Sequence, residues 1–114
     1  MTKILTVIIT GKENINRVNV AFNFSIVARK NGNEVEMLFI GPGVQIVNKK
    51  HAFSQMFYSS IKNGMDLGIR VKACINSINN EGLTKEDIFE GVEFVGGAVE
   101  TSERIKEGYI PVTF

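Results

Sequence analysis

Hydrophobic runs alternate along the chain with segments whose apolar residues recur at helical spacing. Ile4–Ile9 is apolar and mostly β-branched, as in a strand that is covered on both faces. In the next segment, Val18, Ala21 and Phe22 fall on one helical stripe, which Asn31-Gly32 ends. The same reasoning predicts strands at 4–9, 34–40, 69–74, 92–95 and 109–114, and helices at 16–30, 53–67 and 98–106, with a short helix after Thr84.

Strands and helices alternate from one end of the chain to the other. This alternation is typical of an α/β fold, in which a mostly parallel sheet carries helices on both faces and the crossovers are right-handed. We therefore expect a flavodoxin-like three-layer sandwich with five strands in the order 2-1-3-4-5. Because 114 residues suit one core and no linker or repeat interrupts them, we expect a single domain over residues 1–114.

The charge balance argues against a polyanion as partner. Thirteen basic and twelve acidic side chains leave a net charge of +1, whereas nucleic-acid binders usually carry a clear basic excess. The charges are unevenly placed, since residues 1–80 hold ten basic and four acidic side chains, and residues 81–114 hold three basic and eight acidic ones. This asymmetry reflects either chance on solvated faces or head-to-tail contact between subunits.

The remaining composition narrows the compartment and the chemistry. One cysteine cannot form an intramolecular disulfide, and no apolar run approaches the ~20 residues of a membrane span. We therefore expect a cytoplasmic protein whose partners include neither membrane nor nucleic acid. The loop at Thr10–Asn14 lacks the spacing of a phosphate loop, and His51 has no second histidine with which to hold a metal. We expect no cofactor and no metal.

The position of Cys74 favours chemistry there. In an open α/β sheet, ligands bind beyond the carboxyl ends of the strands where the strand order reverses, and in the order 2-1-3-4-5 this point lies between the first and third strands. Cys74 ends the third strand, and free N–H groups after it would favour a thiolate. The alternative is a small, packed core residue. The candidate site consists of Cys74 as the catalytic residue and Thr10, Gly11, Gly41, Gly43, Asn76 and Ser77 as ligand-binding residues.

Several short motifs, taken in order, resemble one family of small α/β proteins. Met37–Val44 is a hydrophobic strand with a Gly-Pro-Gly turn, and Gly68–Cys74 is a strand that leads to a cysteine. Gly82-Leu83 follow eight and nine positions later, and Glu86–Ile88 and Gly91-Val92 come after them. The chain resembles the DsrE/DsrF-like family over nearly its whole length.

This resemblance implies a homo-oligomer, which we expect to be a trimer or a multiple of one, and a cysteine that accepts sulfane sulfur as a persulfide. Cys74 is the residue that matches this position. Relay members often carry basic residues where this chain has Asn80-Glu81, and a nearby carboxylate would raise the thiol pKa, so we expect modest reactivity. The resemblance favours a sulfur carrier or sulfurtransferase that works between donor and acceptor proteins. The alternative is a non-catalytic oligomeric module of the same fold that binds a small ligand or a protein, with Cys74 structural.

Overall fold

The computed structural model describes residues 1–114, except for the side chain of Ser54. Its centre is a parallel sheet of five strands: β1 (Lys3–Ile8), β2 (Glu34–Phe39), β3 (Arg70–Cys74), β4 (Glu93–Val95) and β5 (Tyr109–Thr113). The α-helices are α1 (Ile15–Lys30), α2 (Ser54–Asp66), α3 (Ile75–Asn80) and α4 (Gly97–Lys106), and the 3-10 segments are η1 (Lys12–Asn14), η2 (Gly41–Val47) and η3 (Lys85–Asp87).

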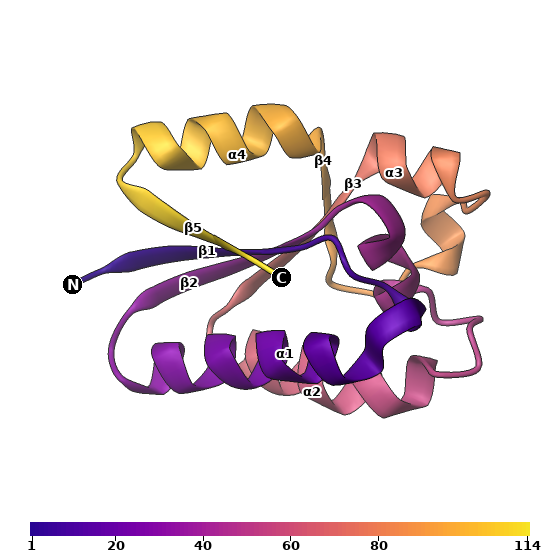
Figure 1. Cartoon of the computed structure of the whole chain (residues 1–114), viewed down its shortest axis with the longest axis horizontal. Coiled ribbons are helices and arrows are strands. Elements are labelled where there is room, and N and C mark those ends of the chain that lie inside the picture. The colour runs from indigo at the N-terminus through magenta and orange to yellow at the C-terminus, as the bar shows by residue number, and fades with distance from the viewer.

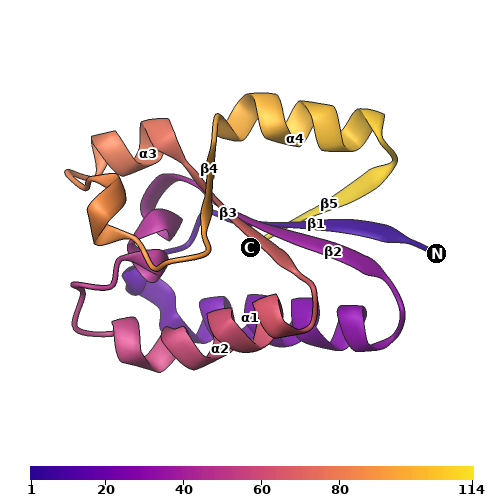
Figure 2. The same cartoon turned by 180° about the vertical axis from the view of Figure 1, so that it is seen from behind.

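The helices form layers on both sides of the sheet. Helices α1 and α2 lie together on one face, and α4 lies on the opposite face (Figure 1). The view from behind confirms this arrangement and places α3 at the end of the sheet where β3 stops (Figure 2). The expected fold class, a five-stranded parallel sheet with helices on both faces, is therefore confirmed.

The strand order corrects one detail of the expectation. Along the sheet the order is β4-β3-β2-β1-β5, so β2 separates β3 from β1, whereas the order 2-1-3-4-5 placed the third strand beside the first. The chain adds β2, β3 and β4 on one side of β1 and returns through α4 to add β5 on the other side. Right-handed crossovers leave the direction of each such step open. As a result, the carboxyl end of β3 lies beside β4 and the start of α4.

The main core lies between the sheet and the helices α1 and α2. The predicted stripe of α1 is buried there, including Val18, Ala21 and Phe22. The ring of Phe22 lies 5.9 Å from that of Phe39 on β2 and 5.8 Å from that of Phe57 on α2, measured between centroids. Aromatic contacts at these separations add to the stabilisation from burial.

The opposite face of the sheet has a smaller apolar core. Leu5, Val7 and Leu38 form a separate buried cluster there. Of the residues of α4, which covers this face, Gly97 is the one that is buried. The helix α4 therefore gains little from apolar burial, and part of the space beneath it stays open.

Two local features differ from the sequence-based expectation. Ile75–Asn80 forms the helix α3, which the sequence pattern did not predict. The short helix expected after Thr84 is a single 3-10 turn that begins with a capping box, in which the Asp87 carboxylate accepts the Thr84 N–H at 2.9 Å. None of the helices that the structure describes combines the length and the apolar character needed to cross a bilayer.

Candidate functional site

Cys74 is the last residue of β3, and α3 begins directly after it. Its side chain is 7% exposed. It lines a pocket of about 760 Å³ that runs between α4 and the sheet. The cysteine is thus largely covered by protein, yet it borders a space large enough for a small molecule.

Hydrogen bonds control the acidity of the Cys74 thiol. Burial raises its pKa, because a thiolate loses hydration there. The Ser77 hydroxyl and the backbone N–H groups of Ser77, Gly97 and Asn76 all donate to the sulfur, and together they outweigh burial. The pKa of Cys74 therefore lies below its ordinary value, which increases the fraction of nucleophilic thiolate near neutral pH.

The Ser77 hydroxyl is itself oriented by the turn after β2. Its oxygen accepts the N–H of Gly41 at 2.8 Å. Gly41 has a φ of 55°, a left-handed conformation that favours glycine, so a larger residue here would strain the turn. Because the Ser77 oxygen accepts from Gly41, its own hydrogen is free to point at Cys74. The hydroxyl thus links the end of β2 to the sulfur.

The absence of a side chain at Gly97 lets α4 approach the sulfur. A Cβ at this position would lie 2.9 Å from Cγ2 of Ile40 and 3.2 Å from both Cβ and Sγ of Cys74. The first distance is too short for two carbon atoms. Because Gly97 has no side chain, its backbone N–H can reach the sulfur of Cys74.

The rest of the pocket is mainly apolar. Among the described residues that line it, Lys106 is the only charged one. The Thr101 hydroxyl donates to the carbonyl of Gly97 at 2.8 Å, which satisfies it within α4. The apolar lining residues are Val7, Ile9, Ile40, Ala98, Ile105 and Pro111.

The structure brings together some of the residues that the sequence nominated. Gly41 and Ser77 line the pocket with Cys74, and Asn76 contributes its N–H to the sulfur. Thr10, Gly11 and Gly43 do not line this pocket. Side chains at two of these positions would collide with backbone, at Gly11 with the Pro42 carbonyl oxygen and at Gly43 with the Ile8 carbonyl oxygen.

Gly97 and the walls on α4 and β5 were missed by the sequence reasoning. The expected strand order placed the crevice between the first and third strands, so the predicted site did not include the segment after β4. The available signal was a glycine pair, Gly96-Gly97, directly between a strand and a helix, since such glycines permit close approach of a backbone.

Glu81 is not among the main groups that shift the pKa of Cys74. It follows the end of α3, at the opposite end of that helix from Cys74. Its carboxylate accepts a hydrogen bond from the Gln45 amide at 3.2 Å. The groups that shift the pKa of Cys74 are Ser77, Gly97 and Asn76.

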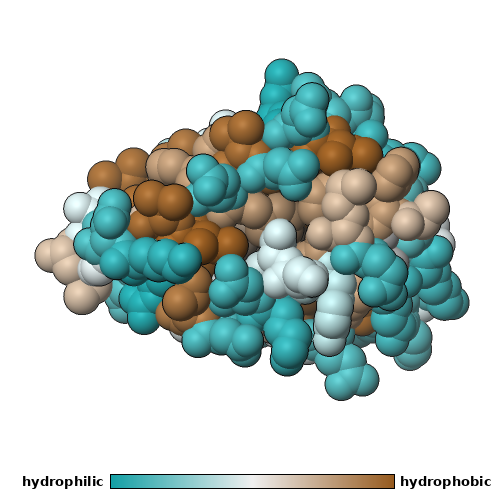
Figure 3. All heavy atoms as spheres, turned by 90° about the horizontal axis from the view of Figure 1, so that it is seen from below, coloured by the Kyte–Doolittle hydropathy of each residue, from teal (hydrophilic) through white to brown (hydrophobic). Residues whose placement is uncertain are grey.

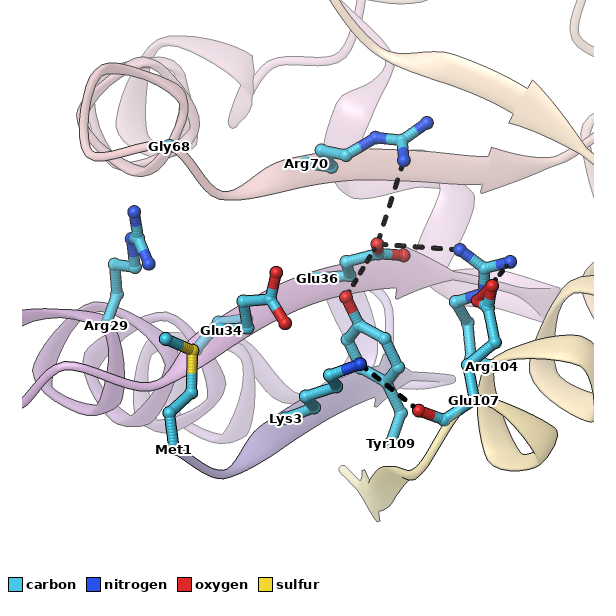
Figure 4. Close-up of a pocket in the computed structure, with 11 residues that line it drawn as sticks. Met1, Lys3, Arg29, Glu34, Glu36, Gly68, Arg70, Arg104, Glu107 and Tyr109 are labelled. Carbon is cyan, nitrogen blue, oxygen red and sulfur yellow. Dashed lines mark hydrogen bonds and ion pairs between the residues drawn. The ribbon is translucent and has the colours of Figure 1, made fainter.

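A second pocket, of about 720 Å³, lies at the other end of the sheet and is lined largely by charged residues (Figure 4). The Glu36 carboxylate points into its centre and accepts a hydrogen bond from the Tyr109 hydroxyl at 3.2 Å. Arg70 and Arg104 lie 3.9 Å and 3.8 Å from the same carboxylate. Burial, followed by the negative charges of Glu36 and Glu34, raises the pKa of Tyr109 to about 12.

A buried ion network beside this pocket fastens α4 to the sheet. Lys72 on β3 is 2% exposed and forms ion pairs with Glu36 on β2 and Glu100 on α4. Arg104, one turn further along α4, lies 3.7 Å from Glu100 and 2.7 Å from Glu107. Charged groups thus take the place of the apolar contacts that α4 lacks, and we assign this end of the molecule a structural role.

Comparison with known proteins settles the family. The model of the DsrE/DsrF-like family matches residues 2–114. This chain belongs to that family. It is also 34% identical over 94 residues to the uncharacterized protein MJ0989 of Methanocaldococcus jannaschii. This alignment covers 77% of this chain and 80% of that protein.

Solved structures share the fold of this DsrE/DsrF-like protein. The protein of unknown function MTH1491 from Methanobacterium thermoautotrophicum superposes with a TM-score of 0.85 at 19% identity, and all of each chain is covered. The ychN protein from E. coli gives a TM-score of 0.82 at 14% identity, again over the whole of both chains. At these identities the likeness establishes the fold alone.

Proposed function

We propose that this DsrE/DsrF-like protein carries sulfane sulfur as a persulfide on Cys74 and passes it to a partner protein. One observation carries the proposal. The sulfur of Cys74 borders a pocket and receives hydrogen bonds from Ser77, Gly97 and Asn76 that lower its pKa. A packed structural cysteine would need neither the pocket nor donors that favour the thiolate.

The chemical step requires one nucleophile and no external oxidant. The Cys74 thiolate attacks the outer sulfur of a donor R–S–S⁻, the S–S bond of the donor breaks, and R–S⁻ leaves with the electron pair of that bond. Cys74 then bears a new S–S bond and a terminal S⁻, so charge and sulfur are conserved. The pocket of about 760 Å³ has room for the added atom. Attack on that terminal sulfur by a partner's thiolate would return Cys74 to its first state.

We further propose that the protein acts as a homo-oligomer, a trimer or a multiple of one, in the reducing cytoplasm. The face of α1 and α2 mixes hydrophobic with hydrophilic residues (Figure 3). On α1, Val20 and Val27 are 56% and 46% exposed. Exposed apolar residues on a small protein favour burial against a second copy, and the opposed charges of the two chain segments support a head-to-tail contact.

Sulfur loading tests the proposed function. The pure protein is incubated with a sulfane donor, and the intact mass is measured for the wild type and for Cys74→Ser. We expect the wild type to gain the mass of one sulfur atom and the variant to gain none. If the wild type gains no mass and its thiol also resists alkylation until the protein unfolds, Cys74 is structural and the fold serves as a binding module.

A further inference from the structure

We propose that the sulfur donor of Cys74 is a small organic anion whose terminal sulfane sulfur is bonded to a second sulfur that carries an apolar carbon group, bound in the pocket along α4. Both an organic persulfide and an organic thiosulfonate have this chemistry. The inference rests on the proposed function, and it adds the class of donor. Three features support this donor class: the apolar walls of the pocket, the charge of the pocket, and the edge of the sheet at β5.

The walls select for an apolar body. Aliphatic surface is exposed to the pocket by Ile9 directly after β1, by Ile105 on α4 and by Pro111 on β5. The volume of about 760 Å³ lies within the range of pockets that bind small organic molecules, about 300–1,000 Å³. Inorganic thiosulfate would lose hydration in such a pocket without gaining apolar contact.

The charge of the pocket suits an anionic sulfur. Of the described residues that line it, none is acidic, and Lys106 is basic. The N–H groups that favour the Cys74 thiolate lie at the point where the donor's terminal sulfur must react. A donor with an apolar body and one negative charge at the sulfur therefore matches both the walls and the reactive end.

The edge of the sheet argues against an extended protein segment as the occupant. β5 is an edge strand, and the N–H of Phe114 donates to Val7 of β1 at 2.8 Å. Because alternate residues of a strand point their N–H groups to opposite sides, Pro111 occupies a position that faces away from β1. Pro111 has no N–H, so the middle of β5 cannot donate a hydrogen bond to a partner strand added at this edge.

A series of donors that share one leaving-group chemistry tests this inference. The rate of sulfur loading on Cys74 is measured by intact mass with benzenethiosulfonate and methanethiosulfonate, whose leaving groups are the corresponding sulfinates, and with thiosulfate. Each rate is divided by the rate of the same donor with free cysteine. We expect benzenethiosulfonate to exceed methanethiosulfonate by about tenfold or more, because its ring is buried against the pocket walls.

Two variants of α4 provide a matched comparison. Ile105→Asp places a carboxylate in the pocket wall, whereas Val99→Asp makes a similar change at an exposed residue of the same helix that does not line the pocket. We expect Ile105→Asp to remove the preference for benzenethiosulfonate and Val99→Asp to retain it. Benzenesulfinate, which has no sulfane sulfur, should slow the alkylation of Cys74 in the wild type and in Val99→Asp.

The outcomes separate the inference from the proposed function. If methanethiosulfonate or thiosulfate loads as fast as benzenethiosulfonate after normalisation, the donor class is wrong while sulfur carriage stands. If benzenesulfinate slows alkylation but no donor loads sulfur, the pocket binds apolar anions and sulfur carriage is wrong. If Ile105→Asp and Val99→Asp behave alike, the pocket along α4 does not bind the donor.

Discussion

Replacement of Gly97 by alanine tests how the protein activates its cysteine. The added Cβ would lie 2.9 Å from Cγ2 of Ile40 and 3.2 Å from Sγ of Cys74. The start of α4 must therefore move away from β3. We expect Gly97→Ala to lose the hydrogen bond from its backbone N–H to the Cys74 sulfur.

The size of the effect follows from that one hydrogen bond. A hydrogen bond to a charged group contributes about 1.5–3 kcal/mol. Since a tenfold change in ionisation corresponds to about 1.36 kcal/mol, Gly97→Ala should hold about tenfold to hundredfold less thiolate at a fixed pH below its thiol pKa. Overpacking beside Ile40 should also lower the free energy of unfolding by about 1–3 kcal/mol.

Ultraviolet absorbance of the thiolate, followed against pH, measures this directly because Cys74 is the one cysteine of the chain. The Cys74→Ser variant supplies the background from the tyrosines. Gly96→Ala is the matched control, because the nearest atom to a Cβ there is Cβ of Val99 at 4.0 Å. A folded Gly97→Ala protein that titrates like the wild type, or a Gly96→Ala protein that shifts equally, would refute the reasoning.

Three further predictions concern the rest of the molecule. Lys72→Met should lower the free energy of unfolding by about 3–5 kcal/mol in urea titration, because it leaves two carboxylates without their buried partner, whereas Lys62→Met on an exposed part of α2 should change it little. In a Tyr58→Phe background, the absorbance of tyrosinate should show Tyr109 ionising near pH 12, and a midpoint near pH 10 would contradict this. Because an unfolded tyrosine ionises at pH about 10, the free energy of unfolding should fall between pH about 10 and pH about 12. Sedimentation at micromolar concentration should show a trimer or a multiple of one, and Val20→Lys should shift it toward smaller species, whereas a monomer of 12.6 kDa in the wild type would exclude the oligomer.

Local sequence patterns were enough to predict most elements of the fold. Periodicity located α1 and its buried stripe, and the start of this helix is capped by Asn14, whose side chain accepts the N–H of Arg17 at 3.1 Å. The sequence pattern did not predict the helix α3, because its six residues include only two apolar ones, Ile75 and Ile78, and the rest are asparagine and serine. Asparagine and serine favour turns as much as helices, so contacts from the rest of the fold decide such a segment.

The strand order depended on information that local patterns do not contain. Nothing in the segment between β2 and β3 indicates whether β3 pairs with β1 or with the free edge of β2. Cys74 and Ser77 were still found, because both lie beyond the carboxyl end of a strand, and ligands of open α/β sheets bind at that edge. Gly97 was not found, because its closeness to Cys74 exists only when β4 lies beside β3.

The release of sulfur to cyanide tests the central claim most directly. Cyanide attacks the outer sulfur of a persulfide, forms thiocyanate and returns the cysteine thiolate, whereas a sulfinic acid, which adds nearly the same mass as one sulfur, releases none. After treatment with a sulfane donor and removal of its excess, the wild type should yield about one thiocyanate per chain, as one cysteine permits. The Cys74→Ser variant should yield none. A wild-type protein that gains mass and yields no thiocyanate would contradict persulfide carriage on Cys74.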